Sequence, residues 1–128
     1  MTYCVGMLLE SGLVFASDSR TNAGVDHIAA YRKMTVYERP GDRVIVILSS
    51  GNLSMTQGVI NLLQKEKSKG HKYESIWQVA TMFEAAQLVG HAIRKVHDTD
   101  GTFLKQVGEE FNVSFIVVVS QKVQIFRF

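Results

Sequence analysis

The sequence predicts an α+β fold in which helices are layered against an antiparallel sheet. Three observations favour this class: β-forming runs fill most of the first fifty residues, two amphipathic helical segments follow, and a further apolar run comes after them. The predicted order of elements is ββββααβ. With 128 residues, 46% of them hydrophobic and 20% charged, the chain is suited to a single domain spanning residues 1–128.

A β-hairpin is expected at the start of the chain. Apolar runs at 3–9 and 13–17 flank Glu10-Ser11-Gly12, which suits a three-residue loop. In that register Asp18 lies diagonal to Thr2 on one face, with roughly 7–8 Å between the two backbones. Both strands are apolar on both faces, which predicts that other layers cover the sheet on two sides.

The remaining elements follow a polar segment at 19–26. Asn52 is suited to cap the first helix, and residues 98–101 are expected to stop the second. The predicted elements are strands at 33–38, 44–49 and 112–120, helices at 53–69 and 75–97, and a short alternating tail at 121–128.

Composition excludes several classes of function. The net charge is only +2, and the one dense basic run, 65–72, alternates with Glu66 and Ser68 at a helix end, so we expect no nucleic-acid partner. The apolar stretch at the N-terminus is short and lacks a basic region, which argues against a secretory signal or a membrane span. Cys4, the single cysteine, suits a reducing compartment and a buried structural thiol. A cytoplasmic protein is expected.

No motif for a cofactor or metal is present. His91 and His97 lie six residues apart on a predicted helix and therefore do not share a metal-binding face, and His27 and His71 lie in predicted loops. We expect neither a metal nor a cofactor.

Thr2 is the strongest candidate for catalysis, because removal of Met1 would free its α-amino group. Such a group titrates near 7.7–8, roughly two and a half units below a lysine side chain, and can accept the hydroxyl proton. Lys33 begins a strand that can return its ammonium to the same end of the sheet. There it would lower the pKa of the amine by repulsion, while Asp18 would hold and neutralise it.

Gly51 completes this candidate site. It ends the strongest predicted strand and precedes a helix N-terminus, where its N–H could stabilise an oxyanion. A structural interpretation stands beside each assignment: Asp18 as a strand-end residue, Lys33 as a surface lysine and Gly51 as a strand-to-helix turn.

Three motifs together resemble one protein family: Met-Thr2-Tyr-Cys-Val-Gly at the start, Ser17-Asp-Ser-Arg20, and Ser50-Gly51. Their joint occurrence resembles the bacterial proteasome-type proteases called Anbu, relatives of proteasome β-subunits and of the HslV protease. The resemblance extends to about Phe115. It implies the N-terminal nucleophile hydrolase fold, an αββα four-layer sandwich, of which this chain would supply the N-terminal half to two-thirds.

The resemblance also implies roles for individual residues. Thr2 would be the nucleophile, Asp18 and Lys33 would assist it, and the Gly51 amide would form the oxyanion hole. The implied partners are a peptide or unfolded-protein substrate and further copies of the chain, in a ring or spiral, with any unfoldase left open. Four residues would approach the pocket for the substrate side chain: Thr21, Tyr31, Ser49 and Leu53.

The chain departs from the family pattern at its C-terminal end. Family domains are longer, and residues from about 117 to 128 read as a divergent tail, so a C-terminally truncated proteasome-like domain is expected. Three functions stay open: a threonine peptidase, an inactive truncated remnant or structural subunit of a proteasome-like assembly, and a small α/β module for dimerisation or binding.

Overall fold

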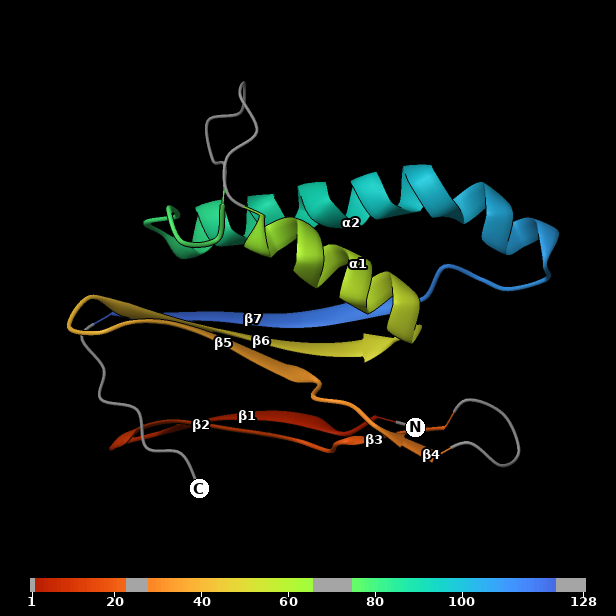
Figure 1. The fold of residues 1–128 in the computed structure, drawn as a ribbon. Helices are drawn as coiled ribbons and strands as arrows, with labels where there is room; N and C mark the ends of the chain where they lie inside the picture. The colour runs from red at the N-terminus through yellow and green to blue at the C-terminus, as the bar shows by residue number, and fades with distance from the viewer. Residues whose placement is uncertain (1, 23–27, 66–74, 122–128) are drawn as a thin grey trace.

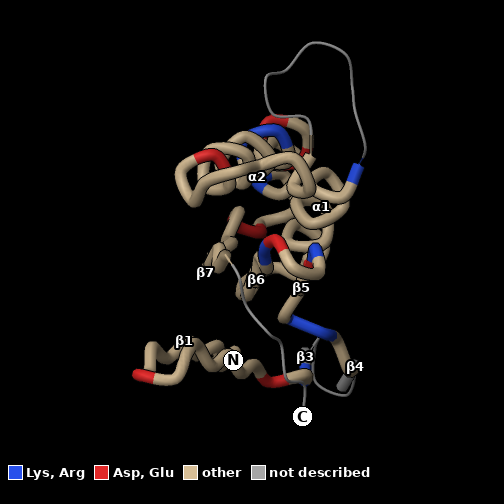
Figure 2. The backbone as a smooth tube through the Cα atoms, turned by 90° about the vertical axis from the view of Figure 1, so that its left-hand side faces the viewer, with Lys and Arg blue, Asp and Glu red and all other residues tan. Residues whose placement is uncertain are grey.

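The computed structural model describes residues 2–22, 28–65 and 75–121. Two helices cover one face of a three-stranded antiparallel sheet, and two small two-stranded sheets lie on its other face (Figure 1). The view turned by 90° separates the same layers (Figure 2). The predicted α+β class is confirmed.

The three-stranded sheet has the order β5-β6-β7, formed by Met34–Arg39, Arg43–Gly51 and Val113–Gln121. All three strands were predicted within one or two residues. The central strand β6 is buried on both faces, which explains its continuous apolar run. Ile45 and Ile47 belong to the core beneath the helices, whereas Val44, Val46 and Leu48 form a second core with the hairpin.

The opening hairpin is confirmed, but its predicted register is wrong. β1 (Cys4–Leu9) pairs with β2 (Gly12–Ser17) so that Leu9 lies opposite Gly12, which leaves a loop of two residues. Gly12 adopts a φ of 143° at the start of the strand, a conformation that glycine accepts readily, and so it does not belong to the loop. Short loops are favoured because their twist matches that of the strands.

Two short strands were missed by the sequence prediction. β3 (Arg20–Asn22) pairs with β4 (Ile28–Ala30), whereas the sequence around them reads as a polar segment. Strands of three residues are too short to show an alternating pattern of apolar and polar residues, so the sequence does not indicate them.

Helix α1 (Leu53–Gln64) begins where it was predicted to begin. The side-chain oxygen of Asn52 accepts hydrogen bonds from the backbone N–H groups of Ser54, at 3.0 Å, and Met55, at 3.4 Å. These bonds satisfy two of the donors that a helix N-terminus leaves free. The helix ends at Gln64 and Lys65 is extended, so the predicted continuation to residue 69 is wrong at Lys65; residues 66–69 and most of the basic run 65–72 lie outside the described residues.

Helix α2 (Met82–Gln106) differs from the prediction at both ends. A capping box starts it: the Thr81 hydroxyl accepts from the Glu84 N–H at 3.2 Å, and the Glu84 carboxylate accepts from the Thr81 N–H at 3.3 Å. The expected stop at 98–101 fails because Gly101 is buried against the His97 ring and the helix continues to bury Leu104. The core contacts of that last turn outweigh weak local propensity.

The prediction that both faces of the hairpin are covered holds only for part of one face, on which Leu8 and Leu13 stay exposed. Cys4 and Phe15 pack against β6, while the other face stays open among the described residues. That open face carries exposed apolar side chains, namely Tyr3, Val5, Met7, Leu9 and Val14. The described residues thus form one helical layer and two sheet layers of the four-layer arrangement.

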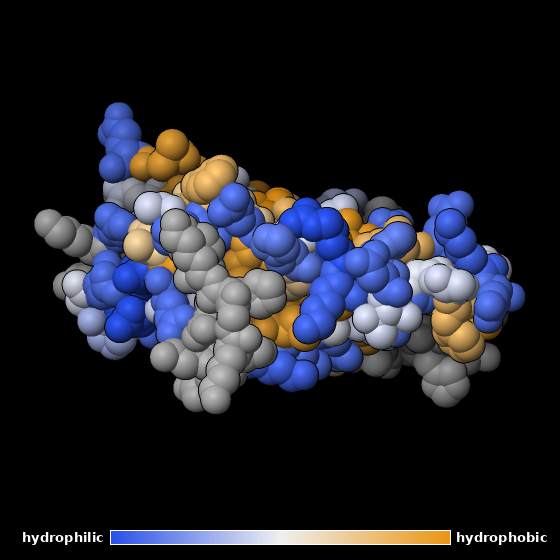
Figure 3. Space-filling model, turned by 90° about the horizontal axis from the view of Figure 1, so that it is seen from above, coloured by the Kyte–Doolittle hydropathy of each residue, from blue (hydrophilic) through white to orange (hydrophobic). Residues whose placement is uncertain are grey.

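The opposite surface of the molecule is formed by the helices. Seen from above, it carries hydrophilic residues with smaller hydrophobic areas between them (Figure 3). Neither helix in the described part of the chain is both long enough and apolar enough to cross a membrane.

Candidate active site

The candidate site lies where the hairpin layer meets the three-stranded sheet. The start of the chain, the pair β3–β4, the end of β6 and the start of α1 lie toward the same end of the molecule (Figure 1). Antiparallel pairing produces this convergence, because the hairpin returns the chain to its starting end before β5 begins.

Lys33 is the centre of the site. Its ammonium nitrogen donates to Thr2 Oγ1 at 3.0 Å, to Asp18 Oδ2 at 2.8 Å and to the backbone carbonyl of Arg20 at 2.7 Å. The residue is only 6% exposed, so these contacts replace most of its hydration. These three oxygen atoms match the three N–H donors of a lysine ammonium group.

Asp18 anchors this lysine and the start of the chain together. One carboxylate oxygen pairs with Lys33, and the other accepts from the Tyr3 N–H at 2.9 Å. The Lys33 hydrogen bond, followed by that of Tyr3, lowers the pKa of Asp18 below its ordinary value. The carboxylate therefore stays ionised at neutral pH and balances the lysine charge.

The contact between Asp18 and Lys33 forms although the predicted register is wrong by one residue. Tyr3, and not Thr2, lies next to Asp18, and the two exchange backbone and side-chain hydrogen bonds. β2 ends at Ser17, so strand alternation no longer decides the direction of the Asp18 side chain. It reaches Thr2 indirectly, through the Lys33 ammonium.

Gly51 is the last residue of β6, and it lies past the point where β5 stops pairing with that strand. The Ser49 N–H donates to the Lys33 carbonyl at 2.8 Å, and N–H groups two residues apart in a strand point to the same edge. The Gly51 N–H thus points to the Lys33 side of β6, past the first residue of β5, Met34. Its φ of 112° is in the region that favours glycine.

The four residues proposed for the substrate pocket are placed differently from one another. Tyr31 is half-buried and its N–H donates to the Ser19 carbonyl at 2.7 Å, and Leu53 is a half-buried residue at the start of α1. Ser49 is only 5% exposed, and its hydroxyl donates to the Lys33 carbonyl at 3.3 Å. Thr21 lies in β3, paired with Ala29. Among these four residues, Ser49 contacts the Lys33 backbone directly.

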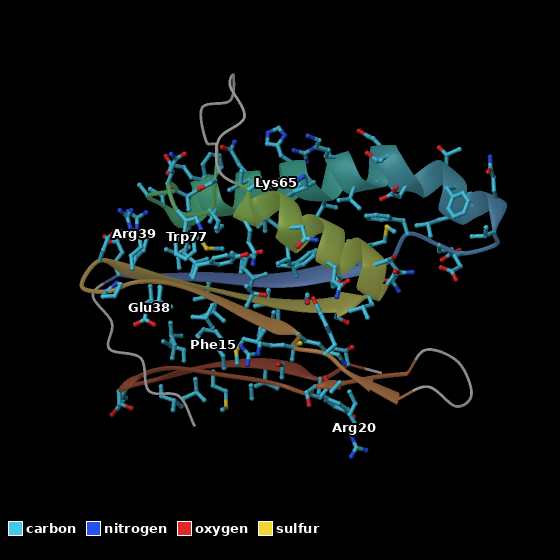
Figure 4. All side chains as sticks on the ribbon, viewed as in Figure 1. Phe15, Arg20, Glu38, Arg39, Lys65 and Trp77 are labelled. Carbon is cyan, nitrogen blue, oxygen red and sulfur yellow. The ribbon has the colours of Figure 1, made fainter. Side chains whose placement is uncertain are left out.

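The Arg20 carbonyl and the Tyr3 N–H are backbone groups of the site that sequence reasoning missed. Any residue type can supply a backbone carbonyl or N–H, so the sequence does not reveal which one takes part. The available indication was that a buried lysine needs three hydrogen-bond acceptors. The Arg20 side chain itself extends away from the three-stranded sheet (Figure 4).

Cys4 lies beside this site as a protonated thiol. Its sulfur is 3.8 Å from the Ser49 carbonyl oxygen, and burial, followed by the nearby Asp18 charge, raises its pKa. The thiolate is therefore scarce at neutral pH, which agrees with a structural role. Groups of three or more metal-binding side chains do not occur in the described ranges.

Comparisons with solved structures identify the family. A mutant of Anbu from Hyphomicrobium sp. strain MC1 matches with a TM-score of 0.79 and 40% sequence identity over 97% of this chain. Anbu from Yersinia bercovieri, described as an ancestral beta-subunit, matches with a TM-score of 0.77 and 40% identity over 97% of this chain. The chain belongs to the Anbu family.

The Anbu complex of Pseudomonas aeruginosa, solved as a helical assembly, gives a TM-score of 0.80 and 41% identity over 94% of this chain. The chain spans about half of these Anbu chains, namely 50%, 49% and 48% of their lengths. Comparison with protein-family models gives no match, and comparison with curated proteins gives none either. The predicted family and its N-terminal nucleophile hydrolase fold are confirmed for the matched half.

Proposed function

We propose that this Anbu chain is a threonine-type peptidase subunit in which Thr2 is the nucleophile after removal of Met1. The observation that supports it most is the 3.0 Å hydrogen bond from the Lys33 ammonium to Thr2 Oγ1. A fixed positive charge at this distance favours the alkoxide form of the hydroxyl and thereby makes it a better nucleophile.

The three hydrogen bonds of Lys33 bear on the identity of the general base. As an ammonium group with three acceptors around it, Lys33 would have no lone pair to take the Thr2 proton. The freed α-amine of Thr2 is suited to the task, because its ordinary pKa is about 7.7–8.0. Repulsion from Lys33 would increase its neutral fraction further.

The proposed reaction has two steps. Thr2 Oγ1 attacks the peptide carbonyl, its own amine takes the proton and passes it to the leaving amine, and an acyl-enzyme forms. The Gly51 N–H stabilises the oxyanion. In the second step water, deprotonated by the same amine, attacks the ester and releases the acyl group. With Met1 in place the Thr2 nitrogen is an amide without basicity, so the unprocessed chain would be inactive.

We further propose that the chain forms a homo-oligomer in the cytoplasm and acts on peptides or unfolded proteins. The helical assembly of the Pseudomonas aeruginosa Anbu complex supports the oligomer. The oligomer is tested by sedimentation velocity, in which a concentration-independent monomer would contradict it.

Hydrolysis of a fluorogenic peptide library tests the peptidase activity. The processed chain, with Met1 removal verified by intact mass, is compared with a chain that retains Met1 and with Thr2→Ala and Thr2→Ser variants. Activity is expected for the processed chain and, at a lower level, for Thr2→Ser. Equal activity in the processed chain and Thr2→Ala would overturn the proposal.

A further inference from the structure

The end of β6 is held by the segment that connects α2 to β7. The Asn52 N–H donates to the Asn112 carbonyl at 2.8 Å, and the Asn52 side-chain amide donates to the Glu109 carboxylate at 3.2 Å. Its side-chain oxygen meanwhile caps α1, so one asparagine joins β6, α1 and the α2–β7 segment. Each of its polar groups has a separate partner.

Gly51 fits closely against the same segment. A Cβ on Gly51 would overlap the Asn112 carbonyl oxygen and would lie 3.0 Å from Val113 Cα. The Asn112 carbonyl therefore occupies the space that a side chain would need, and it binds the next amide along. The peptide groups on both sides of Gly51 are restricted by this contact and by the pairing of Gly51 with Val113.

Glu109 is itself fixed to the C-terminus of α2. Its N–H donates to the Leu104 carbonyl at 2.9 Å, after a turn in which Gly108 adopts a φ of 76°. Such bonds satisfy the free carbonyls at a helix end and hold the departing chain in place. The helix end is thus connected through Glu109 and Asn52 to Gly51.

We propose that Asn52 and Glu109 are positioning residues that aim the Gly51 N–H at the oxyanion, which extends the proposed function to a part of the chain without contact to Thr2. An oxyanion donor is effective only when its direction is fixed before the charge develops. The segment between α2 and β7 supplies that rigidity, because the Asn112 carbonyl binds the Asn52 N–H and the Glu109 carboxylate binds the Asn52 side-chain amide.

Exchange of donor and acceptor separates this role from helix capping. Asn52→Asp keeps a good N-cap but replaces the amide donor by a carboxylate facing Glu109. Asn52→Asp combined with Glu109→Gln reverses the hydrogen bond and restores it. Asn52→Asp combined with Glu110→Gln, at the neighbouring exposed glutamate, is the matched control and should not restore it.

The first readout is acylation of Thr2 in the processed chain by a peptidyl β-lactone. Asn52→Asp should lower the maximal acylation rate constant about tenfold with little change in the half-saturating concentration, and the Glu109→Gln double variant should recover it. An unchanged rate constant in Asn52→Asp, or equal recovery in both double variants, overturns the proposal.

The second readout is hydrogen exchange, by ¹⁵N NMR, of the backbone amide at position 52, whose N–H donates to the Asn112 carbonyl. Protection should fall about tenfold in Asn52→Asp and return in the Glu109→Gln double variant. If neither the variants nor the unsubstituted processed chain is acylated, the proposed peptidase function is wrong. Hydrogen exchange alone then tests the positioning role of Asn52 and Glu109. Unchanged protection of the amide at position 52 in Asn52→Asp would then overturn it.

Discussion

Replacement of Lys33 by methionine tests the charge beside Thr2. Methionine has nearly the same length and suits a site that is 6% exposed, so the change removes the ammonium without opening a large cavity. Two unit charges 3.0 Å apart attract by about 5–6 kcal/mol at an effective dielectric constant of about 20. With about half a charge developed on the oxygen, the transition state loses about 2.5–3 kcal/mol, or roughly a 100-fold decrease in rate.

The assay is the rate constant for acylation of Thr2 in the processed chain, measured for Lys33→Met and for the matched control Lys65→Met. Lys65 is exposed at the end of α1, and its replacement should leave the rate within twofold. Urea unfolding of each variant verifies that the protein is folded at the assay temperature. A Lys33→Met rate constant within threefold of the unsubstituted chain would refute the electrostatic argument.

Three further predictions concern the surroundings of the site. Gly51→Ala should lower the free energy of unfolding by about 2 kcal/mol or more through overlap with the Asn112 carbonyl, whereas Gly41→Ala, with a φ of 77° and open space around it, should cost only about 1 kcal/mol; equal losses in urea titrations would contradict the clash. Because the pKa of Asp18 is lowered in the fold, its stabilising effect is present above about pH 4 and is lost as the pH falls through the folded value. Urea midpoints should therefore fall on acidification, less so in Asp18→Asn, and parallel pH profiles would argue against the pairing. Cys4 should react slowly with a disulfide reagent at pH 7 and faster in urea, and equal rates would show that the thiol is not protected.

Strong local signals explain which parts of the fold could be predicted. The β6 run is apolar on both faces, and Asn52 directly precedes an amphipathic segment, so the strand and the start of α1 were found correctly. The start of α2 was misplaced because the apolar residues Ile76 and Val79 continue the helical period although their segment is a turn. Apolar residues that are buried in a turn give the same sequence pattern as apolar residues that are buried on one face of a helix.

Residue types indicated the site, but its geometry depends on tertiary contacts. Thr2, Asp18 and Lys33 were grouped by their chemistry, and the structure brings Thr2 and Asp18 within hydrogen-bond distance of the Lys33 ammonium. The inferred hairpin register was wrong by one residue, because the loop length is decided by backbone twist and not by the identity of Gly12. The Arg20 carbonyl could not be foreseen, since any residue supplies one.

The site of covalent modification is the most direct test of the central claim that Thr2 is the nucleophile. The processed chain is treated with a peptidyl β-lactone, and the modified residue is located by tandem mass spectrometry. A single adduct on Thr2, absent from Thr2→Ala and greatly reduced in Lys33→Met, is predicted. An adduct on Cys4, or an unmodified Thr2 in a processed and folded chain, would contradict it.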